Sequence, residues 1–379
     1  MGYSLTAKSK ARIISGYSSV FLDSLRICAA ITVLYIHAFD RWFPTQAHDQ
    51  AKPGEPSHAA VIIFFVLSGY VISHTTISNN RGRKQYAQAR LSRLSSMVIP
   101  ALVITAIIQC IISYYNPQML LTYTRGHSLV RYFLSGFFIN EIWLFSSAPP
   151  LNGSLWSLSF EFWYYTIFGL WFFRSSGWKS TMVIILACLI AGPKILLMMP
   201  VWLAGYFAYR LPRPNISTGT AWVCVFAGLA VAWLAITFVP SFPFMIGYKP
   251  LYYANQFVTD WVAGFFIAIP LWILPTTDIA AKKTTWTRAF RYIADLTFPL
   301  YVLHFPLLIL WRCLFGYRLN DTVQLWEAII SVIIAAGLLG VLLEEQRPLW
   351  DTFFKWLLNH VKNVFSKKGD SSNSIAKNV

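Results

Sequence analysis

Apolar runs long enough to cross a lipid bilayer fill most of this chain. A membrane-spanning helix needs about 20 mainly apolar residues, and about ten such stretches can be counted along the sequence. They lie near residues 20–40, 59–77, 94–115, 154–173, 180–193, 195–210, 219–239, 251–274, 292–315 and 323–343. The stretch 130–147 is apolar but interrupted by Asn140 and Glu141, which indicates a re-entrant or interfacial segment. Lipid cannot satisfy open backbone groups, and the alternating pattern of barrel strands is absent. The sequence therefore predicts an all-α polytopic membrane protein with about ten transmembrane helices.

Composition and charge support this class and argue against a nucleic-acid-binding protein. The chain is 56% hydrophobic and only 12% charged, whereas soluble domains carry about 25% charged residues. A net charge of +16 would suggest nucleic acid in a soluble protein. Here the cations cluster between apolar runs, as the positive-inside rule expects, so we predict membrane lipid and no nucleic acid as a partner. The alternation of cation-rich and cation-poor loops places both termini in the cytoplasm.

The domain organisation follows from the same pattern. Residues 1–345 are expected to form one membrane-embedded domain, and residues 346–379 a basic cytoplasmic tail that is partly disordered. Lys8, Lys10 and Arg12 precede the first apolar run. No small-residue cleavage site closes that run, which favours an uncleaved signal anchor.

Two ionisable residues share the first predicted span. Arg26 and His37 are eleven positions apart, which on a helix is about 16 Å along the axis and about 20° around it. Ionisable groups inside lipid are costly, so such a pair is a functional-site hypothesis. The alternative is structural: Arg26 would extend to lipid headgroups, and His37 would hydrogen-bond a neighbouring helix.

A second pair of cations precedes the third predicted span. Arg90 and Arg93 are spaced i, i+3, so on a helix they share a face and can grip a phosphate with bidentate guanidinium groups. Taken on their own, the two arginines are better explained as ordinary positive-inside charge. In the second span, Ser68 and Gly69 permit close helix packing, and a nucleophilic role for Ser68 lacks an identifiable His or Asp partner.

Three further ionisable residues lie inside predicted spans. Glu161, in Trp156–Glu161 (WSLSFE), is expected about 10 Å deep, at a depth comparable with that of His37. A carboxylate and an imidazole at matched depth can tune one another for proton transfer; a structural hydrogen-bonded glutamate is the alternative. Asp260 and His304 are expected to line a polar cavity or to support the site, although a structural role is favoured for both.

The remaining histidines and the cysteines indicate no metal site. His48, His58, His74, His127 and His360 fall in loops, near helix ends or in the tail, and solvated side chains are expected there. The five cysteines form no CxxC pattern, and HExxH, P-loop and GxGxxG motifs are absent.

The motifs taken together resemble those of the bacterial membrane O-acyltransferases of the acyltransferase-three family. They run in order from LDSLR (22–26) and His37 through FFVLSGY (64–70) and the Arg90–Arg93 pair to WSLSFE (156–161) and FPLYVLHFP (298–306). The resemblance spans residues 20 to about 345. Two departures are Ser24, where a glycine is usual, and Phe162-Trp163, which replaces a more polar pair.

The resemblance implies a function, a location and a set of site residues. It implies a multi-pass protein of the bacterial inner membrane that moves an acyl group, most simply acetyl, from cytoplasmic acyl-CoA to a carbohydrate hydroxyl of a cell-surface or secreted glycan. It makes Arg26, Arg90 and Arg93 the acyl-CoA-binding residues and His37 and Glu161 the catalytic ones. Ser68, Asp260 and His304 are expected to bind substrate or support the site, and no metal is expected.

Two mechanisms and two other function classes stay open from the sequence. Neutral His37 can act as general base on the acceptor hydroxyl, or it can carry a covalent acyl group. A transporter or flippase for a glycan or lipid-linked substrate would use the same ionisable residues as a proton relay, although no inverted repeat supports it. A non-catalytic sensor is the third class. The acceptor and the oligomeric state are not predicted.

Overall fold

Helices are the regular elements of the part of the chain that the structure describes. This computed structural model describes residues 12, 14, 16–46, 55–78, 82–243, 251–276 and 285–360. Its helices are α1 (Tyr17–Trp42), α2 (Pro56–Ser78), α3 (Arg83–Tyr115), α4 (Pro117–Leu121), α5 (Ser128–Gly136), α6 (Trp156–Phe172), α7 (Trp178–Ala191), α8 (Pro193–Arg210), α9 (Thr218–Phe238), α10 (Phe257–Ile273), α11 (Thr285–Asp295), α12 (Thr297–Phe315) and α13 (Thr322–Glu345). Short 3₁₀ turns occupy Pro44–Gln46, Gly153–Leu155 and Tyr252–Ala254. The predicted all-α class is confirmed.

Fewer helices are long and apolar enough to span a membrane than the apolar runs predicted. Six helical stretches of the described chain pass, namely Tyr17–Trp42, Pro56–Ser78, Arg83–Tyr115, Thr218–Phe238, Thr285–Phe315 and Thr322–His360. The stretches expected as two spans at 180–193 and 195–210 are α7 and α8, which bend by 112° and together make at most one more. Helices α6 and α10 have 17 residues each, about 26 Å of helix against a hydrocarbon core of about 30 Å. A polytopic membrane protein is confirmed; the count of ten is not.

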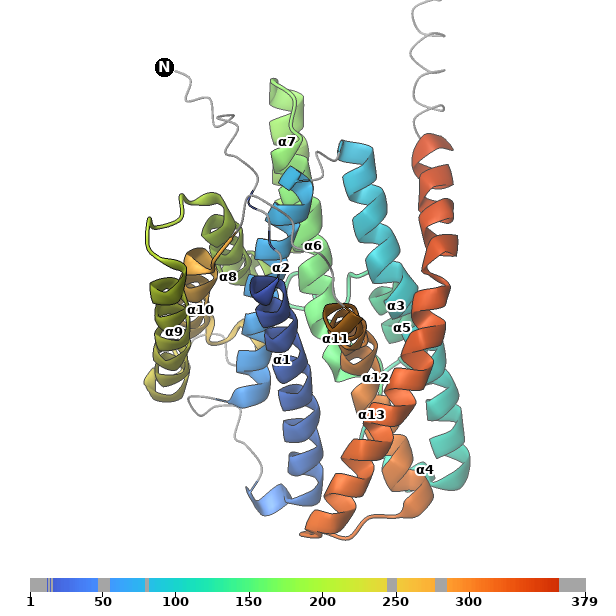
Figure 1. Cartoon of the computed structure of the whole chain (residues 1–379). Helices are drawn as coiled ribbons and strands as arrows, with labels where there is room; N and C mark the ends of the chain where they lie inside the picture. Colours follow the sequence, from blue (N-terminus) through green and yellow to red (C-terminus); the bar gives the residue numbers. More distant parts are fainter. Residues whose placement is uncertain are drawn as a thin grey trace, which may run out of the picture.

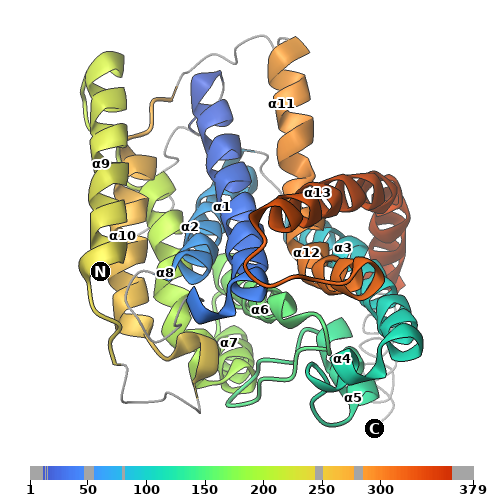
Figure 2. The same cartoon turned by 90° about the horizontal axis from the view of Figure 1, so that it is seen from below.

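The bundle places α1 and α2 at its centre. Seen from below, α8, α9 and α10 lie on one side of this central pair, and α3, α12 and α13 lie on the other (Figure 2). Helix α2 packs against α8, α1 and α10, while α12 packs against α13, α3 and α1 (Figure 1). Helices α1, α2 and α12 therefore each pack against at least three other helices.

Two glycines set the closest helix crossing. A Cβ added at Gly69 of α2 would lie 2.0 Å from the carbonyl oxygen of Trp202 in α8, and one added at Gly205 of α8 would lie 1.9 Å from the carbonyl oxygen of Val66. Small residues allow helices in membranes to pack backbone against backbone. The close packing expected at Ser68 and Gly69 is present, and it fixes α2 against α8.

Part of the segment expected as a basic, partly disordered tail is helical. Residues 347–360 are helical and pack along the first half of α3, where the amide of Gln88 donates to Asp351 at 2.8 Å and Lys84 donates to Asn359 at 3.2 Å. These polar contacts supply the order that the basic composition did not predict. The tail beyond Lys362 lies outside the described residues, as do Lys8, Lys10 and His48.

The glycine crossing generates a stability prediction. Gly69→Ala and Gly205→Ala should each lower the free energy of unfolding by about 1–3 kcal/mol or more, because the new methyl group meets a backbone carbonyl that cannot rotate away. The measurement is the melting temperature and the monodisperse fraction of the detergent-solubilised protein on size-exclusion chromatography. Gly337→Ala in α13 is the control, since a Cβ there meets nothing within 4 Å. Wild-type melting temperatures for both α2–α8 variants would contradict the close crossing.

Candidate functional site

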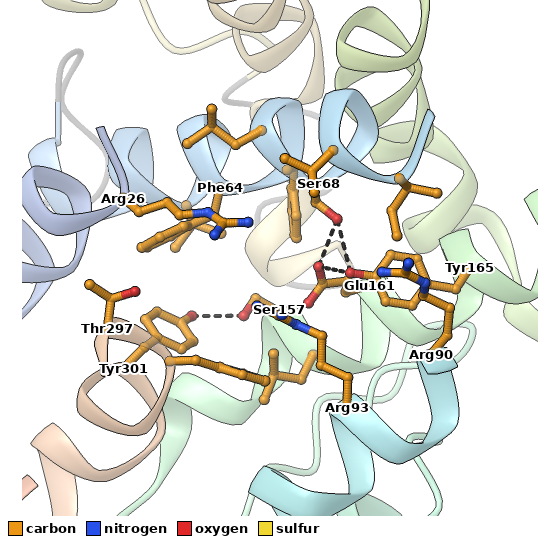
Figure 3. A pocket seen from close by; sticks show the side chains of 17 residues that line it. Arg26, Phe64, Ser68, Arg90, Arg93, Ser157, Glu161, Tyr165, Thr297 and Tyr301 are labelled. Carbon is orange, nitrogen blue, oxygen red and sulfur yellow. Dashed lines mark hydrogen bonds between the residues drawn. The ribbon is translucent and has the colours of Figure 1, made fainter. Parts of the chain in front are cut away.

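The first candidate site is a cavity of about 110 Å³ enclosed by α1, α2, α3, α6 and α12. Four ionisable side chains line it: Arg26 from α1, Arg90 and Arg93 from α3, and Glu161 from α6. Figure 3 shows Arg26 reaching in from one side and Arg90 and Arg93 from another, with Glu161 between them. We call this space the Arg90 cavity. Three cations on two helices face a single carboxylate, so the cavity is suited to an anionic group.

Aromatic rings and few polar partners hold the three guanidinium groups. Arg90 donates to the hydroxyl of Thr75 at 3.0 Å, and its guanidinium carbon lies 5.9 Å from the ring centre of Tyr165. Arg93 lies 5.6 Å from the ring centre of Phe298. The Arg26 guanidinium is 3.9 Å from a carboxylate oxygen of Asp23. Cation–π contacts orient guanidinium groups without neutralising them, so the three arginines give the wall of the cavity a positive character.

Ser68 and Glu161 form a hydrogen-bonded group on the wall of the Arg90 cavity. The Ser68 hydroxyl donates to Oε1 of Glu161 at 2.7 Å, and the Tyr165 hydroxyl donates to the same oxygen. The indole of Trp202 donates to the Ser68 oxygen at 3.1 Å. The sequence identified no acidic partner for Ser68, because Glu161 is distant in the chain. The close α2–α8 crossing beside Gly69 brings Trp202 to this group.

The second candidate site is a larger cavity of about 550 Å³ that contains His37. We call it the His37 cavity. Its wall includes Arg41 of α1, His58 of α2, Trp156 of α6 and Tyr253, together with the segment from Ser146 to Leu151. The Arg26 and His37 side chains, predicted to share one stripe of α1, thus line two different cavities at different depths.

His37 and His304 lie side by side. Their ring centres are 5.2 Å apart, with the rings inclined at 69°. Nδ1 of His304 donates to the carbonyl oxygen of Tyr301 at 2.7 Å, which leaves Nε2 to accept from the Ser154 hydroxyl at 3.4 Å. Nδ1 of His37 is buried without a hydrogen-bond partner among the described residues. His304 is therefore a fixed neighbour that supports His37 by packing rather than by a hydrogen bond.

Two side chains separate the cavities. Val61 of α2 and Tyr301 of α12 line both of them. The Tyr301 hydroxyl is fixed to the start of α6, within 2.7 Å of the Ser157 hydroxyl and 3.1 Å of the Ser154 carbonyl oxygen, to which it donates. Glu161 therefore does not share a cavity with His37, contrary to the expectation of matched depth. The reason is that α6 carries Glu161 two turns beyond Ser154, past the partition.

Asp260 and His58 form a pair that the sequence did not predict. Asp260 does not line either cavity; its carboxylate pairs with Nε2 of His58 at 2.9 Å. His58, expected to be solvated, has only 15% of its side chain exposed, because it starts α2 inside the bundle rather than in a loop. His74 is likewise half-buried against the Tyr209 hydroxyl at 3.2 Å, whereas His127 and His360 are exposed as expected. The described residues contain no group of three His, Cys, Asp or Glu that could hold a metal.

A buried ion pair holds the wall of the His37 cavity. Within the stretch expected to be re-entrant, α5 is followed by irregular chain, and Glu141 there pairs with Lys194 at 2.5 Å; both side chains are fully buried. Lys194 stands at the start of α8, just after the α7–α8 bend, and also donates to the Phe145 carbonyl. Irregular backbone at membrane depth is tolerated only when it is buried in protein. This pair fixes the segment that continues to Ser146 and Leu151.

Sequence reasoning missed several residues that the fold brings to the site. Lys194 is a single cation within an apolar run. The same pattern identified Arg26 in the sequence, and it could have identified Lys194. Tyr301 lies within the FPLYVLHFP motif, beside His304. Asp23 lies within LDSLR and accepts from Arg291 of α11 at 2.7 Å as well as facing Arg26. The i, i+3 spacing of Asp23 and Arg26 is a local signal for that pair. The other partners are far apart in the chain, so no local signal pairs them.

Comparisons with known proteins identify the same family that the motifs resemble. Residues 19–345 match the acyltransferase domain of the acyltransferase-3 family. An O-acetyl transferase of Shigella phage Sf6 is 26% identical over 186 residues, which cover 45% of this chain and 51% of that relative. The chain thus spans about half the length of the relative. No solved structure matches the chain.

The buried ion pair generates a prediction on stability. Lys194→Met should lower the free energy of unfolding by about 3–5 kcal/mol, because it leaves a buried carboxylate without a counter-charge. The measurement is the thermal melting of the purified protein. The double variant Lys194→Met with Glu141→Gln should melt nearer to the wild type, since both charges are removed. Equal melting of the single and double variants would contradict a pair that stabilises through charge.

Proposed function

Because the chain belongs to the acyltransferase-3 family, we propose that it is a membrane O-acyltransferase that uses acyl-CoA as donor and a carbohydrate hydroxyl as acceptor. The Arg90 cavity takes the donor from the cytoplasmic side, and the His37 cavity takes the acceptor. The name of the phage Sf6 relative favours acetyl as the group transferred. The bacterial inner membrane is the compartment in which such a donor and a surface glycan precursor meet.

Charge and size support the Arg90 cavity as the donor site. Acyl-CoA carries several phosphate groups on its nucleotide, and guanidinium groups recognise phosphates with two parallel hydrogen bonds. A cavity of about 110 Å³ holds only the narrow pantetheine end. The nucleotide therefore stays at the mouth, on Arg90 and Arg93, while the thioester extends past Arg26 toward the partition.

His37 supplies the base for a direct transfer. The neutral imidazole accepts the proton of an acceptor hydroxyl in the His37 cavity, and the hydroxyl oxygen attacks the thioester carbon. The C–O bond forms, the C–S bond breaks, and the CoA thiolate leaves and takes up a proton. His304 holds the imidazole in place through ring packing.

One observation carries this proposal: the cavity that contains the arginines and the cavity that contains His37 share the side chains of Val61 and Tyr301. A thioester on one side and a hydroxyl on the other are then separated by a single layer of side chains. Tyr301 rotating away from Ser157 and Ser154 would bring the two substrates together.

The role of His37 generates a prediction on turnover. His37→Ala should lower the rate of CoA release by about 10²–10⁴-fold, because general-base catalysis contributes that much. The measurement is thiol release from acetyl-CoA by purified protein in lipid nanodiscs with a sugar acceptor extract. His127→Ala is the control, since His127 is exposed and lines neither cavity.

The same preparation separates the alternatives. Labelled acetyl-CoA without acceptor should leave no label on the protein; a stable label that His37→Ala removes would contradict direct transfer and support a covalent acyl-histidine. In a second preparation, with the protein in closed lipid vesicles, movement of sugar across the bilayer without any CoA release would instead support a transporter.

The arginines generate a prediction on donor affinity. Arg93→Gln should raise the KM for acetyl-CoA by about 10–100-fold with a smaller change in kcat, because a hydrogen bond to a charged group contributes about 1.5–3 kcal/mol. The measurement is initial rates over a range of acetyl-CoA concentrations. Arg174→Gln is the control, because Arg174 is exposed beyond the end of α6. An unchanged KM for Arg93→Gln would contradict a donor site at this cavity.

A further inference from the structure

The His37 cavity carries a positive charge that the acyl-transfer step does not use. Arg41, Arg125 and Arg131 line it together with His37. Among the described residues none of these three arginines forms an ion pair with a carboxylate. Arg131 donates only to the Ala148 carbonyl oxygen, at 3.2 Å. The cavity therefore presents three guanidinium groups that form no ion pair within the described part of the chain, although Arg131 lies within electrostatic reach of Glu141.

Arg41 lies on the same helix as His37. It stands one turn after His37 on α1, and its guanidinium carbon lies 5.2 Å from the ring centre of Phe305 and 5.8 Å from that of Tyr123. Its Nε atom is buried without a hydrogen-bond partner among the described residues. A buried donor without a partner is costly, so this atom is placed for a ligand that accepts hydrogen bonds.

The acidic residues around the cavity are committed elsewhere. Glu55 accepts from the backbone amide of Ser57 at 3.1 Å and from its hydroxyl at 2.7 Å, so it caps α2. Asp260 pairs with His58 at 2.9 Å. Glu141 pairs with Lys194. Among the described residues, the ion pairs of these acidic groups are therefore made with residues other than the three arginines.

Two of the three arginines lie in a segment that has no acidic residue to balance their charge. Residues 116–135, between α3 and the irregular segment, contain Arg125 and Arg131 and no Asp or Glu. In the proposed orientation this segment faces outward, where the positive-inside rule disfavours unbalanced cations. Two arginines kept against that bias, on the wall of a cavity, indicate a binding role.

Aromatic rings lie next to these charges. Trp156 and Tyr253 stack face to face, with ring centres 4.2 Å apart and planes inclined by 4°. The His58 ring is parallel to Trp156 within 6°. Aromatic rings pack against the C–H face of a pyranose ring, and Tyr123, Tyr252 and Phe305 also line this cavity. The cavity therefore combines aromatic rings for a sugar with a set of donors for an oxyanion.

We propose that the acceptor is a sugar bearing an oxyanionic group, a phosphate or a carboxylate, which Arg41, Arg125 and Arg131 bind in the His37 cavity. This inference rests on the proposed function, because it takes the His37 cavity as the acceptor site. A phosphate would come from a diphosphate linkage of a lipid-carried glycan, and a carboxylate from an acidic sugar. Guanidinium forks recognise both groups with paired hydrogen bonds.

Anion binding tests this without any acyl donor. Inorganic pyrophosphate, glucuronate and glucose are titrated into the full-length protein in nanodiscs, and tryptophan fluorescence follows binding beside Trp156. At least one anion should bind more than about tenfold more tightly than glucose, and Arg125→Gln with Arg131→Gln should weaken that binding about 10–100-fold. Preference for pyrophosphate indicates a phosphate linkage, and preference for glucuronate indicates an acidic sugar.

A control variant and a second assay show whether any loss of anion binding is specific to the His37 cavity. Arg318→Gln should bind anions as the wild type does, because Arg318 is 74% exposed and paired with Asp321. Equal affinity for glucose and both anions, or unchanged anion binding in the folded double variant, would overturn the inference. Thiol release is measured separately: anion binding without any CoA release would overturn the proposed function and leave the anion site standing.

Discussion

The crossing of α2 and α8 determines where both cavities lie. At this crossing Gly69 and Gly205 let two helix backbones meet with no side chain between them. Helix α2 is the wall that both cavities share, since Ser68 and Val61 line the Arg90 cavity and Val61 and His58 line the His37 cavity. A shift of α2 away from α8 would therefore move Ser68 from Glu161 and His58 from Asp260 at once. Small-residue packing is a common way for membrane helices to associate; here it also sets the distance between charged groups.

The polar groups of the bundle are arranged in two layers that differ in charge. In one layer arginines lie against aromatic rings and a hydrogen-bonded carboxylate; in the other two histidines pack edge to face beside further arginines. Few of these groups form ion pairs with one another, and the pair between Glu141 and Lys194 is one that is fully buried. In a low-dielectric interior, charges without partners are costly. Their position on cavity walls, rather than in closed packing, is what gives them access to water and to ligands.

Much of the fold class followed from the sequence, and much of the site geometry did not. The apolar runs predicted helices at α1, α2, α3, α9 and α13, because length and periodicity are local properties. The bend at Gly192 was missed because each half on its own reads as an apolar helix. By contrast, the i, i+3 spacing predicted Arg90 and Arg93 on one face of α3, and both side chains do line one cavity. The depth of Glu161 relative to His37 depends on how α6 enters the bundle after the turn at Gly153–Leu155. The contacts of Lys194, Asp260 and Tyr301 join distant parts of the chain, and no local pattern encodes them.

The partition of Val61 and Tyr301 has a consequence for the cell as well as for chemistry. Two hydrated chambers that met freely within one protein would let protons and small ions pass and would discharge the gradient across the lipid. An aliphatic side chain and a phenol ring tethered to Ser157 and Ser154 stand between the Arg90 cavity and the His37 cavity. Under the proposed function, a short acyl group crosses this layer by a side-chain rotation, without the large rocking motion that a carrier needs to move its whole cargo.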